Sequence, residues 1–202
     1  MGVDIREYKN KLRKKYRGYR ETLSPEEKRQ LDDRIFDRLS ESSFLAQADT
    51  VLCFVSTAVE VDTHRLIHYC WRNGKRVAVP RCLNDKGKMD FFLITSWEDM
   101  ERGRFSLLEP NLSQCEKWVN TDRSVCIVPG FSFDHQGFRL GFGKGYYDRF
   151  LSSYQGVKIG ICYHKCIAYH LPKGRYDVPV DFLVTEKSIR KIKRTDELEA
   201  RK

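Results

Sequence analysis

Residues 124–150 read SVCIVPGFSFDHQGFRLGFGKGYYDRF, and this stretch indicates the fold class of the chain. Residues 125–128 form an apolar run of strand length that ends at Pro129 and Gly130. A short helix is expected over residues 145–153, where large apolar side chains recur at helical spacing. A strand, a loop and a helix in succession are the repeating unit of an α/β fold.

Residues 137–148 combine glycines with charged and aromatic side chains. They are, in order, Gly137, Phe138, Arg139, Leu140, Gly141, Phe142, Gly143, Lys144, Gly145, Tyr146, Tyr147 and Asp148. Closely spaced glycines let backbone N–H groups approach a ligand and form a concave anion site. Lys144 adds a positive charge, and Asp148 offers a carboxylate to a hard cation such as Mg²⁺. The pattern favours a nucleotide polyphosphate site, and a glycine-rich hairpin with solvated charges is the alternative.

Two common phosphate-binding motifs do not fit this segment. A P-loop requires Ser or Thr directly after its lysine, whereas Gly145 follows Lys144. The dinucleotide fingerprint requires a third glycine where Tyr146 stands. The segment is therefore a different kind of glycine-rich loop.

The length and composition predict one domain spanning residues 1–202. The chain has 202 residues, of which 41% are hydrophobic and 32% charged, as in a soluble globular protein. An apolar run of about 20 residues, the length that spans a bilayer, does not occur, so we expect no membrane association. The seven cysteines are odd in number and scattered, which favours a cytoplasmic protein over a secreted disulfide framework.

The positive charge lies at the two ends of the chain. Residues 1–20 carry +6 and residues 186–202 carry +3 of the net charge of +9. The basic N-terminal segment favours either a nucleic-acid-binding arm or a helix that brings positive charge to an anionic small molecule. We expect residues 187–202 to be a solvated, frayed tail.

The periodicity of the N-terminal region predicts two helices. In the first, residues 4–20, the inward face would hold Tyr8, Leu12, Tyr16 and Tyr19, and Lys9, Arg13 and Arg17 would form an adjoining stripe. The second would begin at a capping box formed by Ser24 and Glu27 and run to about Ser40.

The remaining pattern alternates strands with helices. Strands are expected at 51–55, 76–79 (stopped by Pro80), 89–94, 158–163 and 182–185. A helix capped by Asp62 and Thr63 would run to about residue 73, and residues 96–101 would form a short helix or turn with Trp97 inward. Residues 103–123 read as an irregular excursion. The fold class is therefore α/β, with a layered, mostly parallel sheet flanked by helices and a ligand site beyond the carboxyl ends of the strands.

Several segments together resemble the 5-formyltetrahydrofolate cyclo-ligase family, also called 5,10-methenyltetrahydrofolate synthetases. The most specific is GKGYYDR at 143–149. The others, in family order, are KNKLR at 9–13, VEVDT at 59–63, PR at 80–81, VPG at 128–130, FD at 133–134, RLG at 139–141 and VDFLVTE at 180–186.

The resemblance implies a fold like that of phosphosugar isomerases and CoA transferases. It also implies a reaction in which ATP and 5-formyltetrahydrofolate give 5,10-methenyltetrahydrofolate, ADP and phosphate, with Mg²⁺. In the family's mechanism the formyl oxygen takes the γ-phosphoryl group, N10 attacks the activated carbon, and phosphate leaves. The implied partners are these small molecules, and a monomer is expected.

The resemblance also implies roles for individual residues. Lys144 and Arg139 would act in catalysis, and Asp148 and Asp181 would hold Mg²⁺. The folate would contact Val55, Glu60, Met89 and Tyr146. The ATP site would comprise Lys9, Arg13, Arg139, Gly141, Gly143, Lys144, Gly145, Tyr146 and Tyr147.

Each role has a structural alternative. Lys9 and Arg13 can form a solvated helix face, and one of Tyr146 and Tyr147 is expected to pack, because adjacent helical residues face different ways. Asp181 can cap or pair at the start of its strand, Glu60 can cap a helix end, and Val55 and Met89 can be core residues.

The sequence departs from the family pattern at two places. Phe142 stands where an arginine is usual, and residues 173–176 (KGRY) replace a stretch that often holds an acidic residue and a histidine. The competing functions are nucleic-acid binding, and sugar-phosphate isomerisation or CoA transfer on the same fold.

Overall fold

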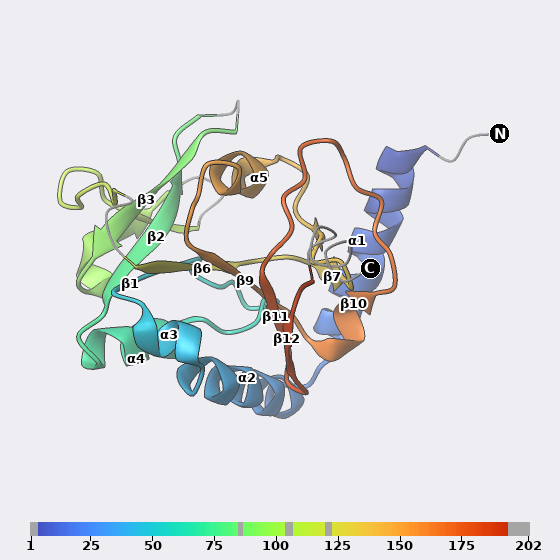
Figure 1. Cartoon of the computed structure of the whole chain (residues 1–202), viewed down its shortest axis with the longest axis horizontal. Coiled ribbons are helices and arrows are strands. Elements are labelled where there is room, and N and C mark those ends of the chain that lie inside the picture. Colours follow the sequence, from blue (N-terminus) through green and yellow to red (C-terminus); the bar gives the residue numbers. More distant parts are fainter. Residues whose placement is uncertain (1–3, 85–86, 104–106, 120–122, 194–202) are drawn as a thin grey trace, which may run out of the picture.

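The computed structural model describes residues 4–84, 87–103, 107–119 and 123–193 (Figure 1). Its α-helices are α1 (Ile5–Glu21), α2 (Pro25–Ser40), α3 (Ser43–Gln47), α4 (His64–Arg72) and α5 (Tyr146–Leu151). Short 3₁₀ turns span Trp97–Asp99 and His164–Cys166. The central strands are β1 (Thr50–Cys53), β2 (Arg76–Cys82), β3 (Met89–Ile94), β6 (Ser124–Val128), β9 (Val157–Ile161), β11 (Phe182–Val184) and β12 (Ile189–Lys191).

These strands form one sheet of order β12-β11-β9-β6-β1-β2-β3. Strands β11, β9, β6, β1 and β2 run parallel, and β3 and β12 lie antiparallel at the two edges. The chain leaves β1 toward β2 and later returns to β6 on the other side of β1. The strand order therefore reverses between β1 and β6, and the carboxyl ends of these two strands are where α/β sheets bind ligands.

Helices cover both faces of the sheet. In Figure 1, α2, α3 and α4 lie below the sheet and α5 lies above it. None of the helices in the described ranges is long and apolar enough to span a bilayer. The α/β class with a mostly parallel, helix-flanked sheet is confirmed.

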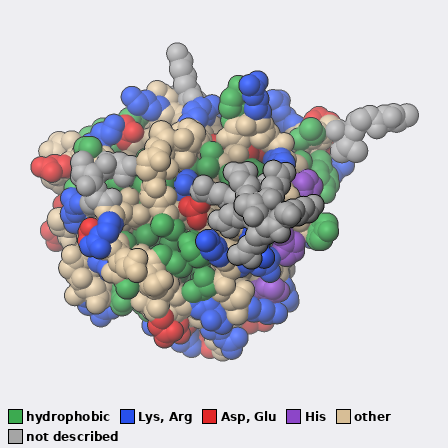
Figure 2. Space-filling model, viewed as in Figure 1, with side chains coloured by type: hydrophobic (Ala, Val, Ile, Leu, Met, Phe, Trp, Pro, Cys, Tyr) green, Lys and Arg blue, Asp and Glu red, His purple; other side chains and the backbone are tan. Residues whose placement is uncertain are grey.

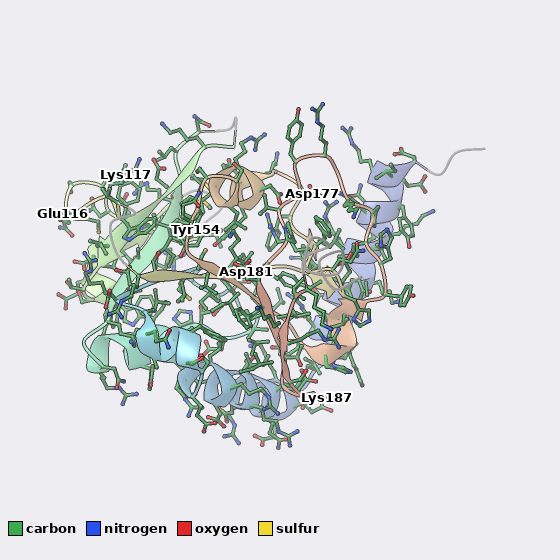
Figure 3. All side chains as sticks on the ribbon, in the orientation of Figure 1. Glu116, Lys117, Tyr154, Asp177, Asp181 and Lys187 are labelled. Atoms are coloured by element: carbon green, nitrogen blue, oxygen red, sulfur yellow. The ribbon has the colours of Figure 1, made fainter. Side chains whose placement is uncertain are left out.

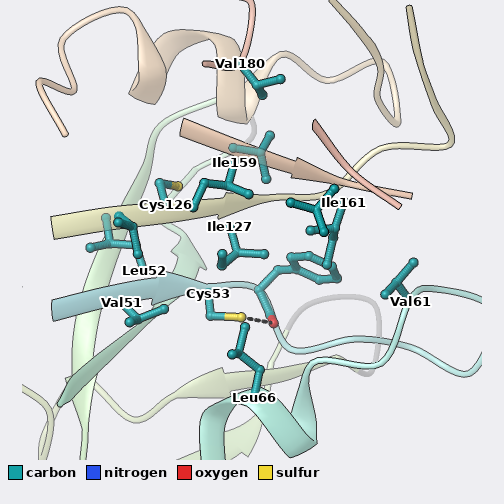
Figure 4. Packing of buried hydrophobic residues seen from close by; sticks show 14 of the residues in the cluster. Val51, Leu52, Cys53, Val61, Leu66, Cys126, Ile127, Ile159, Ile161 and Val180 are labelled. Carbon is teal, nitrogen blue, oxygen red and sulfur yellow. Dashed lines mark hydrogen bonds between the residues drawn. The ribbon is translucent and has the colours of Figure 1, made fainter. Parts of the chain in front are cut away.

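The core is built on strands that are buried along their whole length. All four residues of β1 and all five of β6 are buried, as expected for parallel strands covered on both faces. Figure 4 shows Leu52, Ile127 and Ile159 from three adjacent strands packed together. This rigid centre supports the loops that follow each strand.

The two N-terminal helices confirm the expected elements but correct one face. In α2, Ser24 Oγ accepts a hydrogen bond from Glu27 N at 3.2 Å, and Ser24 N donates to Glu27 Oε2 at 2.8 Å, which completes the capping box. In α1, Tyr16 is buried, whereas Tyr8 is 43% exposed and the buried residue near the C-terminal end is Arg20. The prediction that Tyr8 lies on the inward face is therefore wrong.

Several expected boundaries also differ. Strand β2 continues through Pro80. Its pairing with β1 ends at Ala78, and after Ala78 its partner is β3, so the missing N–H of Pro80 is tolerated. The hydroxyl of Thr63 donates to Phe54 O at 2.7 Å and does not cap α4, while Asp62 accepts from the first turn. In contrast, the short 3₁₀ turn at Trp97 and the packing of Trp97 against the core agree with expectation, and its ring lies 5.0 Å from that of His64.

Short strands occur where the sequence pattern predicts none. They are β4 (Met100–Arg102), β5 (Leu108–Pro110), β7 (Ser132–Asp134), β8 (Arg139–Leu140) and β10 (Ile167–Ala168). Strand β12 lies in the segment expected to be a frayed tail, and the buried Ile192 follows it. The rest of that segment, 194–202, lies outside the described residues.

Gly160 lies in the middle of β9 because the fully buried ring of Phe133 occupies the space that a side chain would need. A Cβ atom on Gly160 would come within 2.5 Å of Phe133 Cε1. In contrast, a Cβ on Gly18, inside α1, would meet nothing within 4 Å.

The replacement Gly160→Ala is expected to lower the free energy of unfolding by about 1–3 kcal/mol, because it overpacks the core. Gly18→Ala is the matched control and should raise the free energy of unfolding by about 0.5–1 kcal/mol through helix propensity. Urea unfolding of both variants measures the two changes. Equal stability of Gly160→Ala and the parent protein would contradict the packing argument.

Candidate active site

A narrow crevice lies at the carboxyl ends of the central strands, at the point where the strand order reverses. It is lined by Arg20, Phe54, Glu60, Val61, Pro129, Gly130 and Ile161. Phe54 follows β1, Pro129 follows β6, and Ile161 ends β9. The crevice therefore occupies the place that α/β sheets use for ligands.

Glu60 supplies a carboxylate to this crevice. It is 7% exposed, and its Oε2 accepts hydrogen bonds from Thr57 N at 2.9 Å and from Thr57 Oγ1 at 2.8 Å. Within the described ranges its Oε1 has no hydrogen-bond partner. Glu60 thus closes the turn at Thr57, whereas the structural alternative predicts that it caps a helix end, and it keeps one acceptor for a ligand's N–H groups.

Arg20 supplies a cation to the same crevice. Its side chain comes from α1 and is buried, and its Nη2 donates to Phe131 O at 3.0 Å and also to Gly130 O. The guanidinium lies 5.6 Å from the centroid of the Phe131 ring. Sequence analysis missed Arg20, although its position four residues after Tyr16 and seven after Arg13 places all three on one helical face.

The glycine segment begins as a hairpin and continues as a loop. Strands β7 and β8 pair antiparallel, and residues 141–145 then lead into α5. Gly143 (φ 91°) and Gly145 (φ 71°) adopt left-handed backbone conformations that other residues rarely take. The hairpin interpretation therefore describes the first part of this segment, and the ligand-loop interpretation of the rest stays a prediction.

Helix α1 packs directly against this loop. Arg13 Nε donates to Gly141 O at 2.8 Å, and a Cβ on Gly143 would lie 2.9 Å from Arg13 Nη2. On the same side of α1, Lys9 Nζ lies 3.5 Å from Asp177 Oδ2, and Asp177 sits in the loop beside α1 (Figure 3). The structure thus brings Arg13 to the glycine loop and Lys9 to the loop that carries Asp177.

Lys144 lies at the surface of the loop. It is exposed, and within the described ranges no side chain or carbonyl hydrogen-bonds to its ammonium group. Its backbone carbonyl accepts a hydrogen bond from Arg149 Nη1 at 2.9 Å, so the loop is braced while the ammonium stays available. Phe142, also on the loop, is 59% exposed, and its ring contacts that of Phe131 in a tilted arrangement at a centroid distance of 4.7 Å.

Arg139 is enclosed rather than solvent-facing. Its side chain is 4% exposed, and its Nη2 lies 2.8 Å from Asp148 Oδ1. Its guanidinium also lies 5.7 Å from the Tyr147 ring centroid. The pair fixes the end of the glycine loop relative to α5.

The two adjacent tyrosines face different ways. Tyr146 is partly buried, and its hydroxyl donates to Asn84 O at 2.9 Å. The Tyr147 hydroxyl is buried with no hydrogen-bond partner among the described residues. Burial raises the pKa of the Tyr147 phenol, and the nearby thiols of Cys126 and Cys53 and the carboxylate of Glu60 add to the rise. Tyr147 is therefore the one that packs inward.

The predicted metal ligands lie apart from any larger acidic cluster. Within the described ranges no group of three or more His, Cys, Asp and Glu side chains is arranged to hold a metal ion. Asp148 adjoins the glycine loop and accepts from Val178 N at 3.3 Å. Asp181, just before β11 (Figure 3), accepts from Lys158 N at 2.9 Å and pairs with the Lys158 ammonium at 3.5 Å. One or two carboxylates with ligand phosphates suffice for Mg²⁺, and Asp148 fits that pattern.

The remaining predicted contacts are apolar. Val55 is half-buried and directly follows Phe54, which lines the crevice. Met89 is buried at the start of β3, opposite Cys82, and is not among the described residues that line the crevice.

Comparison with known proteins gives a consistent result. The profile of the 5-formyltetrahydrofolate cyclo-ligase family matches residues 5–186. The chain is 30% identical to the 5-formyltetrahydrofolate cyclo-ligase of Escherichia coli K12 over 174 residues, which cover 84% of this chain and 96% of that protein. It is 26% identical to the mouse 5-formyltetrahydrofolate cyclo-ligase over 197 residues, covering 92% of this chain and 97% of that protein.

Two solved structures share the fold of this chain. The NMR structure of Aquifex aeolicus 5,10-methenyltetrahydrofolate synthetase superposes with a TM-score of 0.80 at 33% identity, covering 92% of this chain and 93% of that one. A 5,10-methenyltetrahydrofolate synthetase from Mycoplasma pneumoniae superposes with a TM-score of 0.72 at 25% identity, covering 88% and 98%.

The contact between α1 and the glycine loop predicts that Arg13→Ala weakens binding of a non-hydrolysable ATP analogue by about 10-fold or more, because a charged hydrogen-bonding group is lost. Arg17→Ala is the matched control, since Arg17 is exposed and pairs with Glu21 on the same helix. Calorimetric titration measures both affinities. Equal affinities for the two variants would show that Arg13 is a solvated helix charge.

Proposed function

This chain belongs to the 5-formyltetrahydrofolate cyclo-ligase family, and we propose that it performs the family's reaction by phosphorylating the formyl oxygen of 5-formyltetrahydrofolate. It is an ATP-dependent ligase of folate metabolism. The products are 5,10-methenyltetrahydrofolate, ADP and phosphate. The observation that supports the mechanism is the meeting of α1 and the glycine loop, where Arg13 donates to Gly141 O at 2.8 Å.

The chemistry explains why ATP is needed. The formyl carbon is amide-like, and its oxygen is a poor leaving group. Transfer of the γ-phosphoryl group to that oxygen forms an O–P bond and releases ADP. N10 then attacks the formyl carbon, the C–O bond breaks, and the oxygen departs within phosphate. Phosphoryl transfer of this kind depends on positioning and on stabilisation of charge.

The glycine loop and α1 are suited to both tasks. Lys144 would bind the transferring phosphoryl group, because its ammonium is exposed and unpaired within the described ranges. Lys9 and Arg13 would bind the phosphates from α1, and the backbone of Gly141, Gly143 and Gly145 would approach the triphosphate closely.

Arg139 and Tyr147 would support the ATP site from the interior of the protein. Arg139 would hold Asp148 and add positive charge, since the two groups are already paired at 2.8 Å. Tyr147 would support the site from the core side. Phe142, in place of the usual arginine, supplies no phosphate contact.

The folate would bind against the residues that line the narrow crevice. The free oxygen of Glu60 would accept hydrogen bonds from the pterin's N–H groups. Val55 and Tyr146 would contact its apolar and aromatic surfaces. Met89 is buried on β3 and would support the folate site through its packing contacts.

Mg²⁺ would be held by Asp148, with Asp181 as the second protein ligand. The ion would neutralise phosphate charge when ATP is bound. Asp148 is the stronger assignment because it adjoins the glycine loop, whereas the Asp181 carboxylate is bonded to the backbone and the ammonium of Lys158.

We also propose that the protein acts as a cytoplasmic monomer. All seven cysteines are free, which fits a reducing compartment. The alternative of nucleic-acid binding has less support, because acidic side chains are interspersed with basic ones on the face shown in Figure 2.

The deciding assay mixes the purified protein with 5-formyltetrahydrofolate, Mg²⁺ and ATP and follows the methenyl absorbance. We expect the absorbance to rise with all three present and not when ATP is omitted. No rise with folded protein would contradict the proposed function. Product formation without nucleotide would favour isomerase-like or transferase-like chemistry instead.

Lys144→Ala is expected to lower turnover by about 10²–10³, the effect of removing one charged contact to the transition state. Lys11→Ala is the control, because Lys11 is exposed and pairs with Glu7 on α1. The methenyl assay measures both rates. If Lys144→Ala turned over like the control, Lys144 would be a solvated loop charge.

Removal of divalent cations with EDTA is expected to abolish turnover, and added Mg²⁺ should restore it. Asp148→Asn should raise the Mg²⁺ concentration needed for half-maximal rate by about 10-fold or more, because a hard cation loses a charged ligand. Asp37→Asn, at an exposed position on α2, is the control. An unchanged Mg²⁺ requirement in Asp148→Asn would remove Asp148 from the metal site.

A further inference from the structure

Asp32 is a buried carboxylate on α2 that the proposed reaction does not use. Its Oδ1 accepts a hydrogen bond from Tyr163 Oη at 2.8 Å and from Asp62 N at 3.2 Å. Its Oδ2 pairs with Lys28 Nζ at 2.6 Å. Burial raises the pKa of this carboxyl, and these partners oppose the rise. One side chain therefore joins α2, the loop after β1 and the segment after β9.

Tyr163 is the rigid end of this connection. It lies two residues after the end of β9, is fully buried, and has the guanidinium of Arg20 at 5.9 Å from its ring centroid. Because Tyr163 is buried directly after β9, its hydroxyl is held at the carboxyl edge of the sheet. The hydrogen bond from this hydroxyl therefore fixes the Asp32 carboxylate relative to the central strands.

Asp62 N is the other end of this connection, and it lies in the loop that carries Glu60. The base of this loop is closed by Thr63, whose hydroxyl donates to Phe54 O at 2.7 Å. Its turn is closed by Glu60 N, which donates to Thr57 O at 3.1 Å. The hydrogen bond from Asp62 N to Asp32 connects the segment between Thr57 and Thr63 to helix α2.

We propose that Asp32 and Tyr163 are positioning residues that hold the loop of Glu60 in place for the folate. A buried carboxylate is costly unless its lone pairs are bonded, so the arrangement of its donors is strongly determined. The loop therefore has one preferred position relative to the crevice. This inference rests on the proposed role of Glu60 as a folate contact.

The test compares two buried tyrosines. Tyr163→Phe removes the hydroxyl that bonds Asp32. Tyr154→Phe is the matched control, because Tyr154 is 5% exposed and its hydroxyl bonds Ser124 Oγ at 2.9 Å, at the amino end of β6. Each variant loses a buried hydrogen bond, and Tyr163→Phe should lose more stability because its bond is to a carboxylate.

Tyr163→Phe is expected to raise the KM for 5-formyltetrahydrofolate by about 5- to 10-fold while the KM for ATP changes by less than about 2-fold. Tyr154→Phe should leave both KM values unchanged. Equal KM values for folate in the two variants would overturn the inference. If Tyr163→Phe is too unstable to purify, both replacements are made in the Gly18→Ala background.

Hydrogen exchange separates this inference from the proposed function. In Tyr163→Phe, the amides of Glu60 and Asp62 should exchange faster than in the parent protein, and in Tyr154→Phe they should not. Unchanged exchange at these amides would overturn the positioning role whatever the activity. Absence of methenyl product from the parent protein would overturn the proposed function and leave the exchange result to stand alone.

Discussion

The buried guanidinium of Arg20 determines where α1 can lie. A charged group in this position requires hydrogen-bond partners, and it finds them in the carbonyl oxygens of Gly130 and Phe131, directly after β6. The contact holds the C-terminal end of α1 at the carboxyl edge of the sheet. Removing the carbonyl partners while keeping the cation would leave an uncompensated buried charge, which costs about 3–5 kcal/mol.

With that end of α1 in place, its helical geometry decides what its other side chains reach. Arg13 lies seven residues before Arg20, about two turns, and so meets the glycine loop. Lys9 lies one turn further and meets Asp177. The candidate site is thus assembled from the N-terminal helix, the loop after β1 and the glycine segment, which are far apart in the chain. The sheet sets their mutual positions through the carboxyl ends of β1 and β6.

The sequence was sufficient to predict the parts of the fold that depend on local pattern. The continuous apolar runs of β1 and β6 and the capping box of α2 are such parts. Periodicity could not show that Tyr8 lies at the exposed start of α1, because it indicates a helical face but not what covers that face. Strands of two or three residues, such as β8 and β10, are too short to produce a pattern. The strand through Pro80 depends on which neighbour β2 has at that point.

The same distinction applies to the candidate site: local sequence pattern predicts some of its features, and others depend on tertiary neighbours. The glycine segment and the α1 cations carry a strong local signature, and the structure brings Arg13 to the segment and Lys9, on the same helix, to Asp177. The pairings of Asp181 with Lys158 and of Arg139 with Asp148 depend on which strands and helices become neighbours, so the sequence alone could not distinguish them from metal or phosphate contacts. Arg20 was missed for a related reason: a cation on a basic helix resembles a solvated charge until its burial is seen.

The central claim is that the formyl oxygen is phosphorylated and leaves the folate as part of phosphate. It can be tested by supplying 5-formyltetrahydrofolate labelled with ¹⁸O in the formyl group and analysing the released phosphate by mass spectrometry. The account predicts one ¹⁸O atom in each phosphate formed with methenyltetrahydrofolate. Unlabelled phosphate, with the ¹⁸O recovered in water, would contradict it, because the oxygen would then have left without ever bonding to phosphorus.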